Sequence, residues 1–124
     1  MHIGVSAAAL IIVTATTVRA ESLVPRATWI NEMANVLPAA ICRDGSYFRA
    51  CFEVPSKECR ETASVSTASC LQQYTPQIPD PLNQPEDGSH WGQKVGSCTA
   101  ALYILEYKGK KVEDAKCEDI ENWR

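Results

Sequence analysis

Apolar side chains recur every three or four positions over much of the chain, which is the spacing of amphipathic helices. In the first such stretch they are Trp29, Met33, Val36, Leu37, Ala40 and Ile41. Thr28 is placed to cap this helix at its start. The ring of Pro38 would clash with the carbonyl group of Ala34, so we expect a kink or two short helices before the chain stops at Asp44 and Gly45.

The next apolar stretch, residues 47–54, fits two patterns. Tyr47, Phe48, Cys51 and Phe52 fall on one face of a helix, whereas Phe48, Ala50, Phe52 and Val54 alternate as in a strand. We favour the helix, and the strand remains the alternative.

A third pattern predicts a helix over residues 56–74, with Ser56 as its N-cap and Glu58 in its first turn, where a negative charge suits the helix dipole. Its inner face consists of Cys59, Ala63, Ser66, Cys70, Leu71 and Tyr74. Between Thr62 and Ser69 every side chain is small or β-branched, which allows another helix to approach closely.

A fourth helix is predicted over residues 89–107 and ends before Gly109. The residues expected to face the core are Trp91, Val95, Cys98, Leu102 and Leu105. Tyr103, Ile104 and Tyr107 lie off this stripe, so the helix is apolar over more of its circumference than one contact requires. Either a second helix or a binding partner covers them.

Residues 75–88 separate the last two helices and contain four of the seven prolines. We expect this segment to be extended and unable to pair in a sheet, as either a stiff strap or a functional loop. Residues 112–124 predict a short helix held by Cys117, followed by a frayed tail. The expected fold class is therefore all-α, a small domain of four to five helices with a long Pro-rich loop.

Residues 1–20 resemble a secretory signal peptide. The apolar run at residues 7–13 is followed by Val18 and Ala20, small residues that precede a cleavage site, although no Lys or Arg precedes the run. An uncleaved membrane anchor is the alternative, but the run is shorter than the roughly 20 residues that span a bilayer. We therefore expect one mature domain, residues 21–124, in the periplasm or outside the cell, with no further segment that could cross a membrane.

The six cysteines are an even number in a short exported chain, which predicts three disulfides. They are Cys42, Cys51, Cys59, Cys70, Cys98 and Cys117. No Cys-x-x-Cys pair occurs, so a thioredoxin-like redox centre and paired zinc knuckles are not expected. Cys59 and Cys70 would lie about 16 Å apart along one helix, too far to bridge, which leaves twelve of the fifteen connectivities open.

Composition narrows the function classes further. The net charge is −3, and removal of residues 1–20 would leave eleven basic against fifteen acidic residues, a charge of −4 with no basic field for nucleic acid. His90 would be the one histidine left, so we expect no metal site and no cofactor. Its neighbours Asp87 and Ser89 are better explained as turn and cap residues than as a catalytic triad. We therefore expect a non-enzymatic protein.

What remains is surface that could bind a partner. The candidate binding residues are His90, Trp91, Tyr103 and Tyr107, and burial in the core is the alternative for each aromatic ring.

The motifs Phe48-Arg49-Ala50-Cys51-Phe52, Gln84-Pro85-Glu86-Asp87-Gly88 and the stretch 91–98, with Glu58, Cys59 and Cys70, resemble small, exported, cysteine-rich helical proteins of Gram-negative bacteria. In size, export and helicity the chain is also similar to periplasmic immunity proteins that neutralise type VI secretion effectors. The resemblance implies a protein partner. The function we expect is that of an exported binding protein, a periplasmic inhibitor or immunity protein for a toxin or hydrolase, with a secreted effector or a small carrier of apolar ligands as the alternative.

Overall fold

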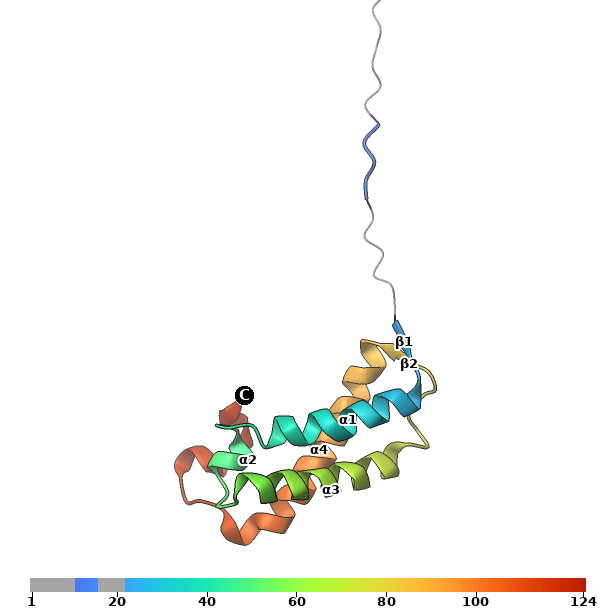
Figure 1. Ribbon diagram of the computed structural model, residues 1–124. Coiled ribbons are helices and arrows are strands. Elements are labelled where there is room, and N and C mark those ends of the chain that lie inside the picture. Colours follow the sequence, from blue (N-terminus) through green and yellow to red (C-terminus); the bar gives the residue numbers. More distant parts are fainter. Residues whose placement is uncertain (1–10, 16–21) are drawn as a thin grey trace, which may run out of the picture.

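The computed structural model describes residues 11–15 and 22–124. The elements follow in the order β1 (Ser22–Val24), α1 (Arg26–Ile41), α2 (Tyr47–Ala50), α3 (Ser56–Tyr74), β2 (Leu82–Gln84), α4 (Glu86–Tyr107) and the 3-10 helices η1 (Lys108–Lys110), η2 (Ala115–Glu118) and η3 (Ile120–Trp123). Figure 1 shows α1 beside α3, with α4 behind them and the small sheet at one end. Helices therefore make up most of the described chain, which confirms the predicted all-α class.

α1 begins and continues differently from the prediction. It starts at Arg26, and Thr28 lies inside it rather than capping it. The backbone N–H of Arg26 is satisfied instead by Asp80 Oδ1 at 3.1 Å, a contact across 54 residues that no local pattern contains. Pro38 does not divide the helix, because it lies in the last turn, where its missing N–H removes a single hydrogen bond and its ring is buried.

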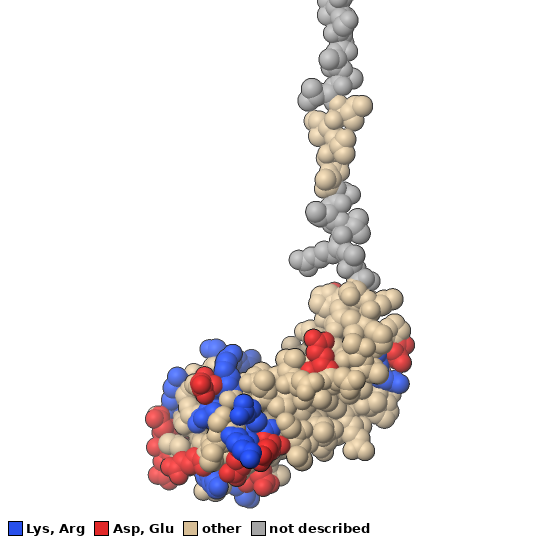
Figure 2. Space-filling model, in the orientation of Figure 1, with Lys and Arg blue, Asp and Glu red and all other residues tan. Residues whose placement is uncertain are grey.

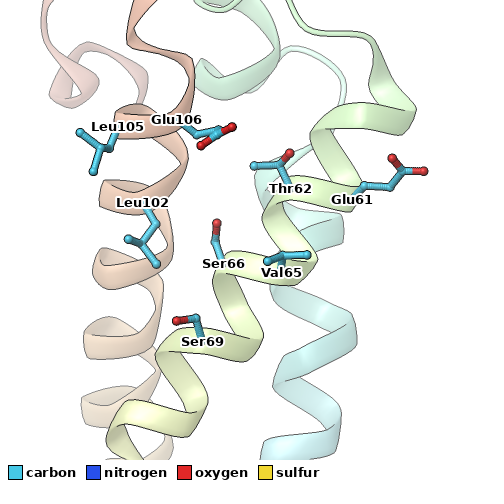
Figure 3. A pocket seen from close by; sticks show the side chains of 8 residues that line it. All are labelled: Glu61, Thr62, Val65, Ser66, Ser69, Leu102, Leu105 and Glu106. Carbon is cyan, nitrogen blue, oxygen red and sulfur yellow. The ribbon is translucent and has the colours of Figure 1, made fainter.

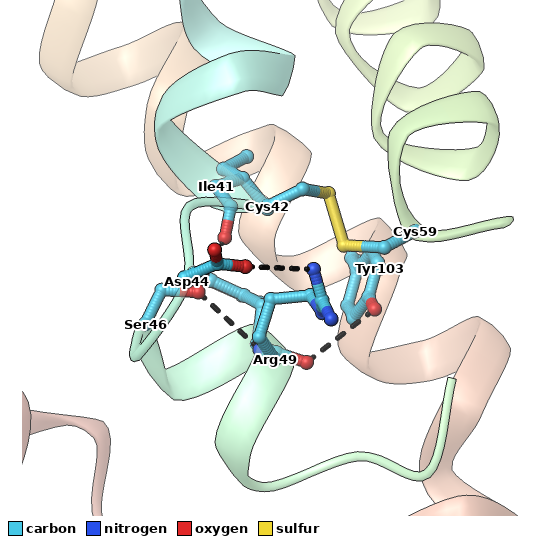
Figure 4. Close-up of polar contacts among 8 residues, drawn as sticks. Ile41, Cys42, Asp44, Ser46, Arg49, Cys59 and Tyr103 are labelled. Carbon is cyan, nitrogen blue, oxygen red and sulfur yellow. Dashed lines mark hydrogen bonds and ion pairs between the residues drawn. A yellow bond between two sulfur atoms is a disulfide. The ribbon is translucent and has the colours of Figure 1, made fainter. Parts of the chain in front are cut away.

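The turn between α1 and α2 is held by Ser46 (Figure 4). The Ser46 hydroxyl donates to the Ile41 carbonyl at 2.6 Å and accepts from the Arg49 backbone N–H at 3.3 Å, which caps α2. Gly45 has φ +77°, a left-handed conformation that favours glycine. The predicted helix is present but short, and Phe52 then pairs with Lys111 in an isolated β-bridge, so each pattern describes part of this segment.

α3 spans the predicted residues. Its N-cap is Pro55, so Ser56 is the first helical residue and not the cap, while Glu58 lies in the first turn as expected. Five of the six predicted inner residues are buried, and Tyr74 is half-buried.

α4 is rotated from the predicted orientation. Its buried residues follow steps of four, namely Trp91, Val95, Thr99, Tyr103 and Tyr107. Thr99 fits in the core because its hydroxyl donates to the Val95 carbonyl at 2.8 Å. Leu102 and Leu105, which were predicted to face inward, are 37% and 62% exposed, and that prediction was wrong.

The Pro-rich segment does contain a strand, contrary to the prediction. Residues Leu82–Gln84 pair antiparallel with β1, in the register Ser22↔Gln84 and Val24↔Leu82. Pro81 and Pro85 flank these three residues, whose own N–H groups are intact, so the strand is as long as the prolines allow. Ile78 and Leu82 are buried at 1% and 0% exposure and hold the segment against the core.

The three predicted disulfides are present, and Cys59 and Cys70 are not paired with each other. The pairs are Cys42–Cys59, Cys51–Cys117 and Cys70–Cys98. The first joins α1 to α3 and the third joins α3 to α4. The second ties η2 to the end of α2, across 66 residues.

The C-terminal segment is anchored rather than frayed. The Trp123 indole N–H donates to the Lys116 carbonyl at 2.9 Å, and the Lys116 ammonium lies 3.9 Å from the centre of the indole ring. The same ring meets Tyr47 edge-on at 6.2 Å. Aromatic and cation–π contacts of this kind order residues that their polar composition alone would leave in water.

The core consists of two clusters, and Leu37 packs against both. One cluster lies near the sheet and includes Trp29, Leu71, Ile78, Leu82, Trp91 and Val95. The other lies near the C-terminal end and is aromatic, with edge-on ring pairs among Tyr47, Phe48, Phe52, Tyr103 and Tyr107. The domain is thus built from two packed ends joined by long helices.

The predicted signal peptide lies outside the described residues apart from residues 11–15. In the part of the chain that the structure describes, no helix combines the length and apolar character needed to cross a membrane.

Candidate functional site

The structure does not bring the four predicted binding residues together. His90 is exposed in the first turns of α4, and its ring meets Trp91 edge-on at 5.0 Å. Trp91 is 9% exposed and belongs to the cluster near the sheet, whereas Tyr103 and Tyr107 are 0% and 6% exposed and belong to the aromatic cluster. Core packing, the alternative stated above, thus accounts for the three aromatic rings, and binding through any of the four residues stays a prediction.

A surface groove between α3 and α4 is the more prominent feature (Figure 3). Its volume is about 460 Å³, within the roughly 300–1,000 Å³ typical of ligand sites. The lining residues are Glu61, Thr62, Val65, Ser66, Ser69, Leu102, Leu105 and Glu106. Val65 and Leu105 are 73% and 62% exposed, so aliphatic surface remains in contact with water.

The groove follows from how the two helices pack. On α3 the lining includes the small side chains of Thr62, Ser66 and Ser69. On α4 it includes Leu102 and Leu105, of which Leu105 points away from α3 in Figure 3. Because Tyr103 and Tyr107 occupy the core-facing side of α4, the two leucines between and beside them are rotated toward the outside. The same rotation that fills the aromatic core therefore leaves leucines in the groove.

Thr62, which lines the groove, also takes part in a polar contact between the helices. The Tyr107 hydroxyl donates to Glu58 Oε1 at 3.3 Å, and Thr62 Oγ1 lies 2.5 Å from the same phenol oxygen. Burial is the main cause that raises the pKa of Tyr107 above 10.0, with the Thr62 hydrogen bond opposing it. The phenol therefore stays protonated at neutral pH and holds α3 to the end of α4.

The charges on the lining are both negative. Glu61 and Glu106 lie at the same end of the groove, near Thr62, and no Lys or Arg lines it (Figure 3). Figure 2 shows the Lys, Arg, Asp and Glu residues gathered mainly at the end of the molecule that holds α2 and the C-terminal segment, while the rest of that face is largely uncharged. From Thr62 to Pro79 the sequence contains no charged residue.

The groove presents hydroxyl and carboxylate groups beside aliphatic side chains. His90 lies 15 residues from Leu105 on α4, about 22 Å along the helix. Among the described residues no group of three His, Cys, Asp or Glu side chains could hold a metal ion. All six cysteines are in disulfides, so none is available as a thiol nucleophile.

Sequence reasoning missed this groove because it assigned Leu102 and Leu105 to the core. Two sequence patterns taken together could have indicated the groove. Residues 62–69 are small, which leaves space beside α3, and the helix 89–107 has more apolar positions than one core contact needs. Two facing helices with these properties leave apolar surface in an open groove.

Comparison with known proteins gives one match. Residues 23–117 match a family described as T2SS substrate NttA, where T2SS is the type II secretion system, while no curated protein and no solved structure matches the chain. The comparisons show no similarity to type VI immunity proteins. The matched segment starts in β1, includes all six cysteines and the groove, and ends at Cys117. Together with the three disulfides, this family match confirms that the protein is exported, to the periplasm or out of the cell. The chain belongs to the family of the T2SS substrate NttA.

Proposed function

We propose that the protein is a non-enzymatic binding protein that leaves the cell through type II secretion and binds a protein partner outside it. The observation that carries this proposal is an open groove with exposed aliphatic side chains in a disulfide-bonded domain of a secretion-substrate family. Exposed aliphatic side chains in a lined groove are typical of interaction sites.

The family favours a secreted binding protein over a periplasmic immunity protein. An immunity protein must stay where the incoming toxin acts, whereas a secretion substrate moves out of the periplasm. The carrier hypothesis receives less support, because the largest interior side chains, among them Tyr103, Phe52 and Leu82, fill the core, and the groove lies on the surface. Inhibition of a hydrolase remains one way in which a secreted binding protein could act.

The route of export is tested by cell fractionation. We expect the mature protein in the culture medium of a host with an intact type II system, and its accumulation in the periplasm when the outer-membrane channel of that system is deleted. A resident periplasmic enzyme, measured in the same fractions, controls for leakage. Retention in the periplasm despite an intact channel would contradict secretion and favour the periplasmic inhibitor.

The absence of enzymatic activity is tested separately. Purified, oxidised protein should show no turnover above a buffer blank against peptide, ester and glycoside substrates. A hydrolytic activity that His90→Ala abolishes, with the fold intact by circular dichroism, would overturn this part of the proposal.

A further inference from the structure

Three exposed aliphatic residues of the domain line the groove, whereas others lie elsewhere on the surface. Val65, Leu102 and Leu105 line one groove. Leu23 on β1, at 66% exposure, and Val36 on α1, at 53%, do not line it. A lone exposed aliphatic residue is ordinary, but several that share a concave surface indicate an occupant.

The groove is two helical turns long. Glu61 and Ser69, which mark its two ends on α3, are eight residues apart, or about 12 Å along the axis. A helix that lies in such a groove places residues i, i+3 or i+4, and i+7 against it. The small side chains of Ser66 and Ser69 allow the backbone of that helix to approach closely.

The electrostatics of the groove select the charge of the occupant. Glu106 forms no ion pair within the described residues, and Glu61 has only an i,i+4 contact with Lys57 at 3.9 Å, in which both side chains are largely exposed. Such exposed pairs contribute little, so both carboxylates remain open to a new cation. The rest of the lining carries no charge. A complementary ligand is therefore apolar along its length and positive at one end.

We propose that the groove between α3 and α4 is the docking site for an amphipathic helix of a partner protein, whose apolar face packs on Val65, Leu102 and Leu105 and whose Lys or Arg at one end pairs with Glu61 and Glu106. This proposal rests on the proposed function as a secreted binding protein, and it specifies the partner chemistry.

Two other occupants fit the charges less well. In a symmetric pair of two copies joined groove to groove, the acidic end of each groove would lie against the uncharged end of the other, so four carboxylates would lose water without gaining a cation. Anionic lipid headgroups would be repelled by Glu61 and Glu106.

The test uses two synthetic helical peptides with identical leucines at i, i+4 and i+7, one with two lysines at its end and the other with two glutamates there. Their fluorescence anisotropy is measured against the full oxidised domain at low salt. We expect the lysine peptide to bind about tenfold more tightly than the glutamate peptide. Glu106→Lys should reverse this order, and Leu105→Ser should weaken both peptides. Leu23→Ser is the matched control, an equally exposed leucine away from the groove, and should change neither affinity.

Three results would overturn the proposal. The first is equal binding of the two peptides, or an order that Glu106→Lys leaves unchanged. The second is a concentration-dependent dimer, seen by light scattering, that Leu105→Ser dissolves, because the occupant would then be a second copy. The third is binding to phosphatidylcholine and phosphatidylglycerol vesicles that Leu105→Ser abolishes.

Failure of this proposal is distinguishable from failure of the proposed function. A protein that reaches the medium but does not discriminate the peptides retains its function as a secreted protein and loses the assigned groove. A protein that stays in the periplasm but binds the lysine peptide selectively retains the groove and loses the export route.

Discussion

Tyr103 is the largest side chain in the structure that is fully buried, and its hydroxyl has one weak partner, the Phe48 carbonyl at 3.5 Å (Figure 4). Burial disfavours the phenolate, and with smaller contributions from Tyr107 and Glu58 it raises the pKa of Tyr103 from 10.0 to about 12. Stability should therefore depend on Tyr103 at alkaline pH.

The direction of this pH dependence follows from the protons bound in the folded and unfolded states. Between pH 10 and pH 12 the unfolded chain releases the Tyr103 proton while the folded domain keeps it, so the free energy of unfolding falls as pH rises. This stabilisation is present in full below pH 10 and is largely lost by pH 12. Urea unfolding across this range should show a shallower fall for Tyr103→Phe than for the wild type. Parallel curves for the two proteins would contradict the assignment.

Leu105 was predicted to face the core, and the residues that occupy the inner face of α4 explain why this prediction was wrong. Its spacing from Trp91 and Val95 fits an inner face, but Thr99 and the two tyrosines occupy that face instead. Thr99 is buried because its hydroxyl finds a backbone carbonyl, and Tyr103 is buried because Phe48 and Phe52 surround it from about 50 residues away. Apolar spacing along α4 shows neither the hydrogen bond that lets a polar threonine be buried nor the distant aromatic rings, so this spacing alone did not predict the rotation of α4.

At the scale of elements, the best-predicted features depend on short-range chemistry. The limits of α3 follow from Pro55 before it and the breakdown of the apolar pattern after Tyr74, and the exclusion of a Cys59–Cys70 pair follows from helix length alone. The start of α1 and strand β2 were missed, since Asp80 and β1 supply their partners from distant parts of the sequence. Long-range pairing is what the local pattern lacks.

The Cys51–Cys117 disulfide is the element-scale feature with the clearest energetic consequence. In the chain-entropy account a bridge that closes 66 residues stabilises by about 4 kcal/mol, against about 3 kcal/mol for the 17 residues closed by Cys42–Cys59. Thermal unfolding should therefore show a larger loss for the double variant Cys51→Ala/Cys117→Ala than for Cys42→Ala/Cys59→Ala.

The matched pair controls for the general effect of removing two buried sulfurs. Hydrogen exchange adds a local readout, because residues 108–124 should become less protected in the first variant and keep their protection in the second. Equal losses of stability, with residues 108–124 still protected, would show that Trp123 and its contacts hold the segment without the disulfide.

At the scale of the whole molecule, charge and apolar surface are separated. Most charged residues lie at the end formed by α2 and the C-terminal segment, while the helical body is largely uncharged on the face in Figure 2. The groove lies at the border between the two regions, with its carboxylates toward α4's last turn and its small side chains toward the body. A partner that fits it must match both regions at once.

Net charge offers a competing explanation for any preference for basic ligands, because the chain carries a net charge of −3 and would attract cations at long range. Substitutions distinguish attraction by the net charge from contact with the groove. Glu118→Lys changes the net charge as much as Glu106→Lys does, but Glu118 does not line the groove. If the groove selects the ligand, only Glu106→Lys should reverse the preference between the lysine and glutamate peptides.

Salt concentration also distinguishes the two explanations. The Debye length falls from about 20 Å at 20 mM salt to about 4 Å at 500 mM, so long-range attraction should vanish over this range. Direct contact with Glu61 and Glu106 is screened less, and apolar packing on Leu105 is hardly affected by salt. The lysine peptide should therefore weaken with salt yet remain ahead of the glutamate peptide, and Leu105→Ser should reduce binding at both salt concentrations. Anisotropy titrations at the two salt concentrations measure both affinities. If the preference for the lysine peptide disappears at high salt and responds equally to Glu118→Lys, the preference comes from the net charge of the molecule and not from the groove.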